Sequence, residues 1–263
     1  MIRALYTAAS GMTAQQLNVD NIANNLANAN TAGFKMRRAQ FEDLIYQNML
    51  QPGTSAGQQT TVPVGLQLGL GTKAAGNDII LTQGNLSSTG NPLDLAIQGN
   101  GFFQIVLPSG QLAYTRSGAF QMDRNGNMVT ADGNLLQPQI TIPANAQSVT
   151  IAQDGTVSYT VANQSAAQKA GQIQLANFQN PAGLNSIGSS LFTATDASGD
   201  AQIGAPGSSE GLGNVMQGYV EQSNVDVVEE FVNLIQSQRA YEANSRVVKA
   251  ADEMYQQVNQ LPQ

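Results

Sequence analysis

The sequence predicts an α+β protein with long N- and C-terminal helices, paired as a coiled-coil-like stalk, and an antiparallel β domain inserted between them. Two observations predict this fold class. Apolar residues recur every seven positions near both ends of the chain, and turn signals separate alternating apolar residues in the middle. Helices at opposite ends of a chain can pair only if the chain between them folds back. We therefore expect the two termini to lie side by side.

The first helix is expected from Ile2 to about Asn28, and the glycine at Gly33 marks the end of the helical region. Its apolar residues gather on one side, whereas its other faces carry asparagine and glutamine in place of charge. A helix with so little charge is expected to face further protein and not water. The apolar seam consists of Leu5, Met12, Val19, Ile22 and Leu26.

A connector without charge is expected after the first helix. No charged residue lies between Leu44 and Thr72, and this stretch is rich in glycine and proline, which disfavour a packed core. From Val62 to Leu70 the apolar residues alternate with period two. That alternation predicts an extended edge strand lying on another surface.

The middle of the chain, from about Asn77 to Gly213, predicts short strands joined by hairpins. Turn dipeptides occur at Ser109-Gly110, Asn125-Gly126 and Asp154-Gly155, each between apolar segments of strand character. The Asn-Gly pair predicts a two-residue turn with two positive φ angles. These hairpins together predict a compact antiparallel β domain.

The second helix carries the clearest signals. Asp226 and Glu229 have the spacing of a capping box, and no glycine or proline follows until Pro262. At 1.5 Å per residue the helix is expected to be roughly 50 Å long. Its apolar seam consists of Val227, Phe231, Leu234, Tyr241, Val248 and Tyr255.

Composition excludes several classes of function. The chain has neither cysteine nor histidine, so the usual general base and the commonest metal ligands are missing. We therefore expect no enzyme, no cofactor and no metal. A net charge of −7 disfavours nucleic acid as a partner, because phosphate binding needs clustered cations. No apolar run of about 18 residues occurs, so direct membrane insertion is not expected, and no cleavable signal peptide is visible.

Two short motifs have the residue types of a ligand site. The segment 123–127 alternates acidic and amide side chains like a calcium loop, but its glycine is the fourth residue and not the sixth. Gly99 and Gly101 suggest a phosphate loop, yet the third glycine and the following helix are missing. Both motifs are interpreted as turns. A glycosidase-type carboxylate pair stays open, because such pairs form only in the fold.

A family resemblance is carried by several longer motifs, at 9–12, 21–35, 99–103, 114–120, 218–225 and 238–245. The chain resembles flagellar rod and hook axial proteins, and this likeness spans nearly its whole length. Among members of that family, the length and the connector are most like those of the distal rod subunit, whereas the terminal motifs are shared with other rod subunits and with hook protein.

The resemblance implies a structural subunit that polymerises into a rigid helical tube, encloses an export channel and transmits torque. It implies a place in the periplasm-spanning rod of the basal body, reached through the flagellar type III apparatus without a cleaved signal peptide. The implied partners are further copies of the chain, other rod proteins and the hook protein. Periplasmic and outer-membrane ring proteins would act as a bushing around the β domain.

We therefore expect four regions: 1–34 as the N-terminal helix of an inner tube domain, 35–76 as the connector, 77–214 as a β-rich outer domain, and 215–263 as the C-terminal helix completing the tube. The seam residues named above are the candidate subunit-packing residues, within one subunit or between subunits. Two other classes stay open: a secreted carbohydrate-binding or cell-wall-active β protein, and a monomeric adhesin-like module.

Overall fold

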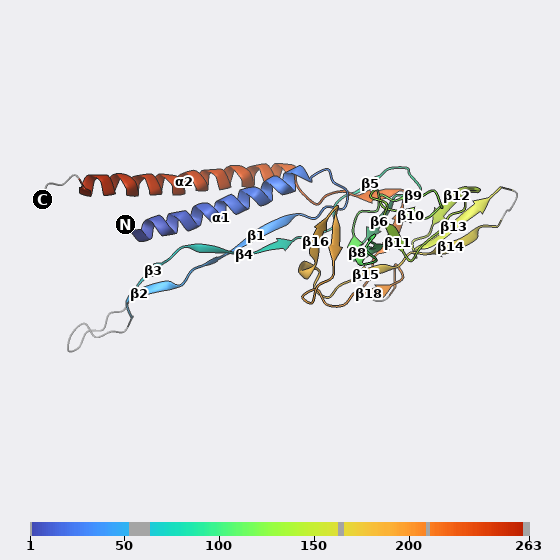
Figure 1. Cartoon of the computed structure of the whole chain (residues 1–263), viewed down its shortest axis with the longest axis horizontal. Coiled ribbons are helices and arrows are strands. Elements are labelled where there is room, and N and C mark those ends of the chain that lie inside the picture. Colours follow the sequence, from blue (N-terminus) through green and yellow to red (C-terminus); the bar gives the residue numbers. More distant parts are fainter. Residues whose placement is uncertain (1, 53–63, 163–165, 209–210, 260–263) are drawn as a thin grey trace. The chain divides into compact units, whose positions relative to one another are not determined.

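The structure is a computed structural model that describes residues 2–52, 64–162, 166–208 and 211–259 (Figure 1). The chain divides into two compact units. Unit 1 comprises Met1–Leu26, Arg37–Asp78 and Asp226–Gln263, and unit 2 comprises Ala27–Met36 and Ile79–Val225. Each unit therefore combines segments from both halves of the chain. The α+β class is confirmed, with one helix near each end and strands between them.

Unit 1 contains the two helices, α1 (Ile2–Ala27) and α2 (Val227–Asn259). The predicted start of the second helix is confirmed. The Asp226 carboxylate accepts hydrogen bonds from the backbone N–H groups of Val228, at 2.9 Å, and Glu229, at 3.2 Å, which satisfies two donors of the first turn. Neither described helix is long and apolar enough to cross a membrane.

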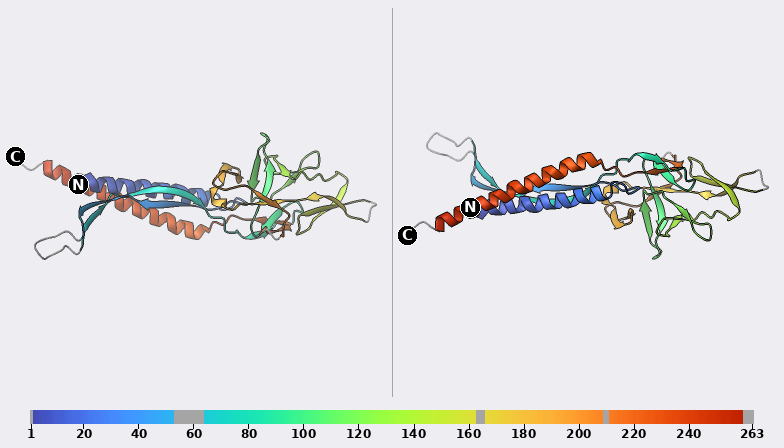
Figure 2. Two further views of the ribbon diagram at one scale, coloured as in Figure 1. Left: turned by 90° about the horizontal axis from the view of Figure 1, so that it is seen from below. Right: turned by 90° about the horizontal axis from the view of Figure 1, so that it is seen from above.

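The two helices of unit 1 lie side by side and run in opposite directions (Figures 1 and 2). Asn18 donates a hydrogen bond to Ser237 at 2.8 Å, and Asn25 donates one to Glu230 at 3.2 Å. A step of seven residues along α1 is thus matched by a step of seven back along α2. The chain folds back so that the two helices lie side by side, as expected, whereas coiled-coil packing of the helices stays a prediction. The two chain ends themselves lie outside the described residues.

A third point of close approach follows the same register. Gly11 on α1 lies so near Asn244 on α2 that a Cβ at Gly11 would come within 2.8 Å of the Asn244 amide nitrogen. Glycine in a helix interior costs about 1 kcal/mol relative to alanine. The close approach of the two helices explains why glycine occupies this position despite that cost.

A two-stranded ribbon of unit 1 follows α1 (Figure 1). It pairs β1 (Arg37–Asp43) with β4 (Thr72–Ile79). Asn77 donates a hydrogen bond to the Asn21 side chain at 2.9 Å, which ties β4 to the helix. Asn18, Asn21 and Asn25 of the asparagine-rich face of α1 bind partners within the same chain. Contact of this face with further protein stays a prediction.

The ribbon continues into a second hairpin of unit 1, β2 (Tyr46–Leu50) and β3 (Leu66–Gly69). The predicted extended strand is therefore present as β3, in the second half of the alternating stretch. Val62 and Pro63, which open that stretch, lie outside the described residues.

Unit 2 is built from antiparallel strands. Its nine-stranded sheet has the order β16-β17-β8-β7-β11-β10-β9, with β15 pairing β7 and β18, and a three-stranded sheet has the order β12-β13-β14. Two further pairs, β6 with β19 and β5 with β20, join residues before and after the large sheet. The bounds are β5 Leu86–Ser88, β6 Leu95–Gln98, β7 Phe102–Val106, β8 Leu112–Thr115, β9 Gln121–Met122, β10 Met128–Val129, β11 Leu135–Gln137, β12 Ala146–Ile151, β13 Thr156–Val161, β14 Gln168–Gln172, β15 Leu175–Asn177, η1 Pro181–Gly183, β16 Asn185–Gly188, β17 Leu191–Thr193, β18 Gln202–Gly204, β19 Asn214–Gln217 and β20 Tyr219–Glu221.

The three predicted hairpins are confirmed as β7–β8, β9–β10 and β12–β13. The predicted geometry of the Asn-Gly turn is wrong, because of that dipeptide only Gly126 has a positive φ, of 81°. The Gly126 N–H donates to the Asp123 carbonyl at 2.8 Å, so the turn begins at Asp123 and spans four residues. The segment 123–127 is therefore a hairpin turn, as interpreted.

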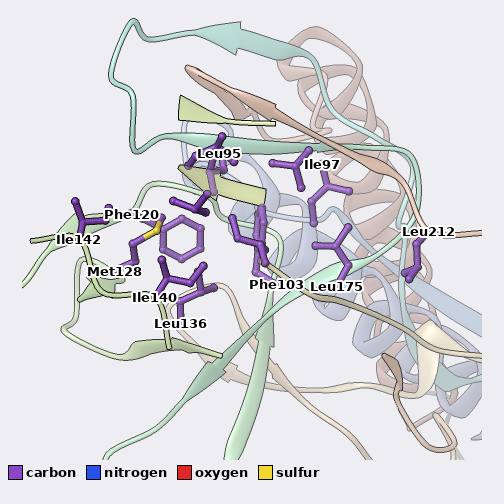
Figure 3. Close-up of a cluster of buried hydrophobic side chains, with 14 residues drawn as sticks. Leu95, Ile97, Phe103, Phe120, Met128, Leu136, Ile140, Ile142, Leu175 and Leu212 are labelled. Carbon is purple, nitrogen blue, oxygen red and sulfur yellow. The ribbon is translucent and has the colours of Figure 1, made fainter. Parts of the chain in front are cut away.

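The main core of unit 2 lies between these sheets (Figure 3). Phe103 and Phe120 meet edge to face there, with ring centroids 5.2 Å apart. A second cluster gathers Phe102, Tyr114 and Phe178. Unit 2 therefore has a core of its own, able to hold buried polar groups in fixed positions. The main cluster contains Leu95, Ile97, Phe103, Phe120, Met128, Leu136, Ile140, Ile142, Ile151, Val157, Ile173, Leu175, Leu212 and Val215.

Candidate assembly surfaces and a buried ion cluster

The predicted seam residues do not form one continuous buried line within the chain. On α1 only Ile22 is buried, and the others are half-buried. On α2, Leu234, Val248 and Tyr255 are half-buried, whereas Val227, Phe231 and Tyr241 are exposed. The positions that hydrogen-bond between the helices are polar instead. A role of the seams in subunit packing stays a prediction. The half-buried seam residues of α1 are Leu5, Met12, Val19 and Leu26.

One face of α2 presents apolar side chains to solvent. Val228, Phe231, Val232 and Ile235 are each about half exposed or more, from 48% for Phe231 to 74% for Val228. Their spacing of three, four and seven residues places them on one stripe of the helix. We call this set the α2 stripe.

The register of the β2–β3 hairpin separates its side chains onto two faces. Gln47 lies opposite Leu68, and Asn48 opposite Gln67. Side chains alternate along a strand, so Leu66 and Leu68 share a face that excludes Gln67. An irregularity after Asn48 brings Leu50 opposite Leu66, on the same face.

Two residues beyond the strand ends continue this apolar face. Leu44 donates its N–H to the Gly71 carbonyl at 2.8 Å, so the ladder extends past Tyr46 and Gly69. Ile45 and Leu70 then fall on the face of Leu68. All five apolar members are exposed, from 40% to 84%. We call Ile45, Leu50, Leu66, Leu68 and Leu70 the leucine face.

Three charged side chains meet in the interior of unit 2 and form what we call the ion cluster. The Lys35 ammonium lies 2.6 Å from one carboxylate oxygen of Glu221, and Arg116 Nε lies 2.5 Å from the other. Lys35 is 4%, Arg116 5% and Glu221 1% exposed. They come from three distant segments: the residues after α1, the residues after β8, and β20.

Backbone groups complete the hydrogen bonding of the ion cluster. The Lys35 ammonium donates to the Thr82 carbonyl at 2.8 Å, and the Gly84 N–H donates to Glu221 at 2.9 Å. The Arg116 guanidinium donates to the carbonyls of Ile97, Gly99 and Gly101. Such acceptors make it possible to bury these cations.

The Arg116 contacts explain the glycine-rich loop at 99–101. Gly99 and Gly101 have φ angles of 105° and 130°, which L side chains rarely adopt. In this conformation both carbonyls reach the guanidinium. A phosphate-binding loop would direct N–H groups at its ligand, whereas this loop directs carbonyl oxygens at a cation. The loop is thus a turn, as interpreted, and it serves the ion cluster.

The ion cluster holds two cations and one carboxylate, so it carries one net positive charge. Burial lowers the pKa of Lys35 below its ordinary value of 10.5. Glu221 opposes this shift in pKa, and the neighbouring Arg116 adds to it. Within the described part of the chain, Glu221 is the one carboxylate in an ion pair with either buried cation.

Two asparagines of the motifs bind backbone groups. Asn224 accepts the N–H of Met36 at 2.7 Å and donates to the Ile80 carbonyl at 2.8 Å, within unit 2. Asn25 accepts the N–H of Arg37 at 2.9 Å and donates to its carbonyl at 2.8 Å, within unit 1. Asn224 thus joins the residue before β1 to the residue after β4, and Asn25 joins α1 to the first residue of β1, each by taking the place of a peptide partner.

Lys35, Arg116 and Glu221 lie within three of the family motifs, 21–35, 114–120 and 218–225, but the motifs alone indicate no role for these side chains. A signal was available for two of them. Arg116 and Glu221 each stand alone among uncharged residues, and in such surroundings a charge is more often paired than solvated. Lys35 carries no such signal, because Arg37 and Arg38 follow it closely. Nothing local showed that the three would meet.

Three family models match the chain. The flagella basal body rod protein model matches residues 5–35, the flagellar hook protein FlgE/F/G D1 domain model 96–159, and the flagellar basal body rod FlgEFG protein C-terminal model 216–261. Each matched region contributes one member of the ion cluster.

Relatives match over nearly the whole chain. The flagellar basal-body rod protein FlgG of Caulobacter vibrioides is 52% identical over 261 residues, covering 99% of both chains. The protein of the same name from Borreliella burgdorferi is 49% identical over 263 residues, again covering 99% of both. That of Buchnera aphidicola subsp. Baizongia pistaciae is 48% identical over 261 residues, covering 99% of this chain and 100% of its own.

Proposed function

Because the chain belongs to the family of flagellar basal-body rod proteins, we propose that it is a structural subunit of the distal rod, polymerising into a rigid helical tube that encloses the export channel and transmits torque. It is a structural protein and not an enzyme. A carbohydrate-binding, cell-wall-active or adhesin-like role is not favoured, since relatives named as rod proteins cover the chain from end to end.

The observation that carries the polymer proposal is the apolar surface of unit 1. The α2 stripe and the leucine face both present large aliphatic or aromatic side chains to solvent. Monomeric soluble proteins rarely expose contiguous apolar faces of this kind, because burial stabilises them by about 25 cal/mol per Å². Both surfaces therefore suit contact with another protein.

A further copy of the chain is the proposed occupant of these surfaces. No charged residue lies between Leu44 and Thr72, so the hairpin can be buried against a neighbour without desolvating an ion. The leucine face and the α2 stripe are different surfaces of one chain. If one contacts the other on a neighbour, the contact is heterologous and repeats, which generates a helical filament.

The helices are proposed to form the inner tube. In this proposal α1 and α2 pair as a coiled-coil-like stalk, with the polar line at Asn18 and Ser237 between them. The half-buried seam residues, such as Leu234 and Val248, would complete their burial against neighbouring subunits. Polar residues at such positions fix helix register at some cost in stability.

Further partners are proposed from the family. These are other rod proteins, the hook protein, and periplasmic and outer-membrane ring proteins that surround the β domain as a bushing. The proposed site is the periplasm-spanning rod, reached by flagellar type III export without a cleaved signal peptide. The proposed self-assembly rests on the leucine face and the α2 stripe, and it does not depend on these partners.

Adjacent residues of β3 provide the experiment that tests polymerisation. Leu68→Asp places a charge on the leucine face, and Gln67→Asp places the same charge on the opposite face of the same strand. We expect Leu68→Asp to abolish sedimentable polymer and Gln67→Asp to preserve it, with unchanged helix content of both monomers by circular dichroism. If Leu68→Asp polymerises as well as Gln67→Asp does, the leucine face is not a contact between subunits.

A further inference from the structure

The ion cluster joins the two chain segments that border the helices. Lys35 follows α1 by eight residues, and Glu221 precedes α2 by six. The backbone repeats this link, because the Gly33 N–H donates to the Glu221 carbonyl at 2.8 Å. Residues 27–36 and β20 are therefore held together by one backbone hydrogen bond and one buried ion pair, both through Glu221.

The link between these two segments depends on the charge of the Glu221 carboxylate. Without the Glu221 carboxylate, Lys35 and Arg116 would be two buried cations with only neutral carbonyls as acceptors. Removing one partner of a buried ion pair is strongly destabilising, because the uncompensated charge stays in a medium of low polarity. The two cations would also repel each other. Docking of the N-terminal segment before β20 arrives would therefore bury two cations without a counter-charge, a cost that its other contacts, such as Ile80 N–H to the Met36 carbonyl, have to offset.

β20 itself is held by pairings with residues that lie far earlier in the chain. It pairs with β5, Tyr219 opposite Ser88 and Glu221 opposite Leu86. The Gln222 N–H donates to the Asn85 carbonyl at 2.9 Å. These pairings join residues more than 100 positions apart and need nearly the whole chain to be present.

We propose that Lys35, Arg116 and Glu221 form a closing clasp, in which arrival of Glu221 locks residues 27–36 and β20 onto unit 2 in one cooperative step. Strands β7, β8 and β11 can pair beforehand, because their ladder joins residues within 102–137 and includes no member of the clasp. The clasp thus keeps the N-terminal segment undocked until the C-terminal segment is in place. This inference concerns the folding of a single chain and does not rest on the proposed polymer.

Hydrogen exchange on full-length variants tests the clasp. Glu221→Gln keeps the size of the side chain but removes the anion, and we expect exchange of residues 27–36 and 219–225 to accelerate together, by about a hundredfold. The β7 and β8 amides should keep their protection. The matched control is Glu42→Gln, which breaks the exposed pair between Lys73 and Glu42, 3.1 Å apart, and should change exchange less than about fivefold.

Charge balance distinguishes the clasp from simple packing. Lys35→Met leaves Arg116 paired with Glu221, so it should accelerate exchange less than Glu221→Gln does. Adding Lys35→Met to Glu221→Gln should restore part of the protection, because only one unpaired cation then remains. The proposal is overturned if the double variant exchanges faster than Glu221→Gln, or if residues 27–36 stay protected while 219–225 alone open.

Refolding of the unmodified chain covers the case in which Glu221→Gln fails to fold. Pulse-labelling during refolding should protect the amides of Gly33 and Gln222 in the same kinetic phase, after or with those of β7. Protection of Gly33 in an earlier phase than Gln222 would overturn the clasp.

Discussion

Asn18 on α1 donates a hydrogen bond of 2.8 Å to the hydroxyl oxygen of Ser237 on α2, which is almost fully buried. Asn18→Ala should therefore leave a buried hydroxyl without this partner and lower the free energy of unfolding by about 1–2 kcal/mol. Urea denaturation of the monomer measures this loss. Asn18→Ala and Ser237→Ala together should cost less than the sum of the two single changes. Additive costs would mean that the bond contributes nothing.

Gly33 and Gly90 provide a matched pair of substitutions, because both have a φ of 71°. A Cβ at Gly33 would overlap the backbone of Arg116 and Ser117, whereas a Cβ at Gly90 meets nothing within 4 Å. Gly90→Ala should cost about 1 kcal/mol, from backbone strain alone, and Gly33→Ala should cost about 3 kcal/mol or more. Thermal unfolding compares them. Equal losses would show that strain, and not the close approach, dominates at Gly33.

The lowered pKa of Lys35 predicts a pH dependence of stability. Between that lowered pKa and the ordinary value of 10.5, the unfolded chain binds more protons than the folded chain. The free energy of unfolding contributed by Lys35 should therefore rise with pH across this window. Urea denaturation from about pH 8 to about pH 10 measures the rise, which should be absent in Lys35→Met. Identical slopes for both proteins would contradict the assignment to Lys35.

Asp226 caps the first turn of α2, where its carboxylate accepts two backbone N–H groups. Asp226→Ala should lower the free energy of unfolding by about 1 kcal/mol and fray the start of the helix. Asp252→Ala, in the last two turns, is the control. A carboxylate there opposes the helix dipole, so its removal should be neutral or slightly stabilising. Amide exchange of the first turn of α2 distinguishes the two changes.

The half-buried seam residues predict an assembly phenotype. Leu234→Asp or Val248→Asp should abolish rod completion and swimming motility, because the charge would have to be buried at a subunit contact. Gln238→Asp, on the exposed side of the same helix, should have a weaker effect. Swimming assays and electron microscopy of basal bodies measure both. Motile cells with normal rods would remove these positions from the proposed contact.

Local signals predicted the elements whose causes are local. Asp226 and the long uninterrupted stretch after it were sufficient for α2, and the glycine turns were sufficient for three hairpins. The conformation at Asn125 was not predicted, because the turn begins at Asp123, one residue before Arg124, where a turn centred on Asn125 and Gly126 would begin. Dipeptide preference alone does not distinguish those two turns.

Contacts between distant residues could not be predicted from periodicity. The seven-residue spacing indicated a seam, but the residues that hydrogen-bond between the helices are Asn18, Asn25, Glu230 and Ser237, which share that spacing on a neighbouring line. Likewise, Lys35, Arg116 and Glu221 carry no mark of their common location. Their meeting depends on strand pairings of β5, β6 and β20 that no local pattern specifies.

The discontinuous make-up of unit 2 affects how this protein can be dissected. The Ile80 N–H donates to the Met36 carbonyl at 2.8 Å, so the chain leaves unit 2 and re-enters it at nearly one point. The excursion 37–78 could therefore be excised and replaced by a short turn without stretching the remaining backbone. Simple truncation of the first 78 residues would instead remove residues 27–36 of unit 2 together with the segments of unit 1. A minigene that encodes 27–36, a glycine-rich bridge and 79–225 is the natural route to an isolated unit 2.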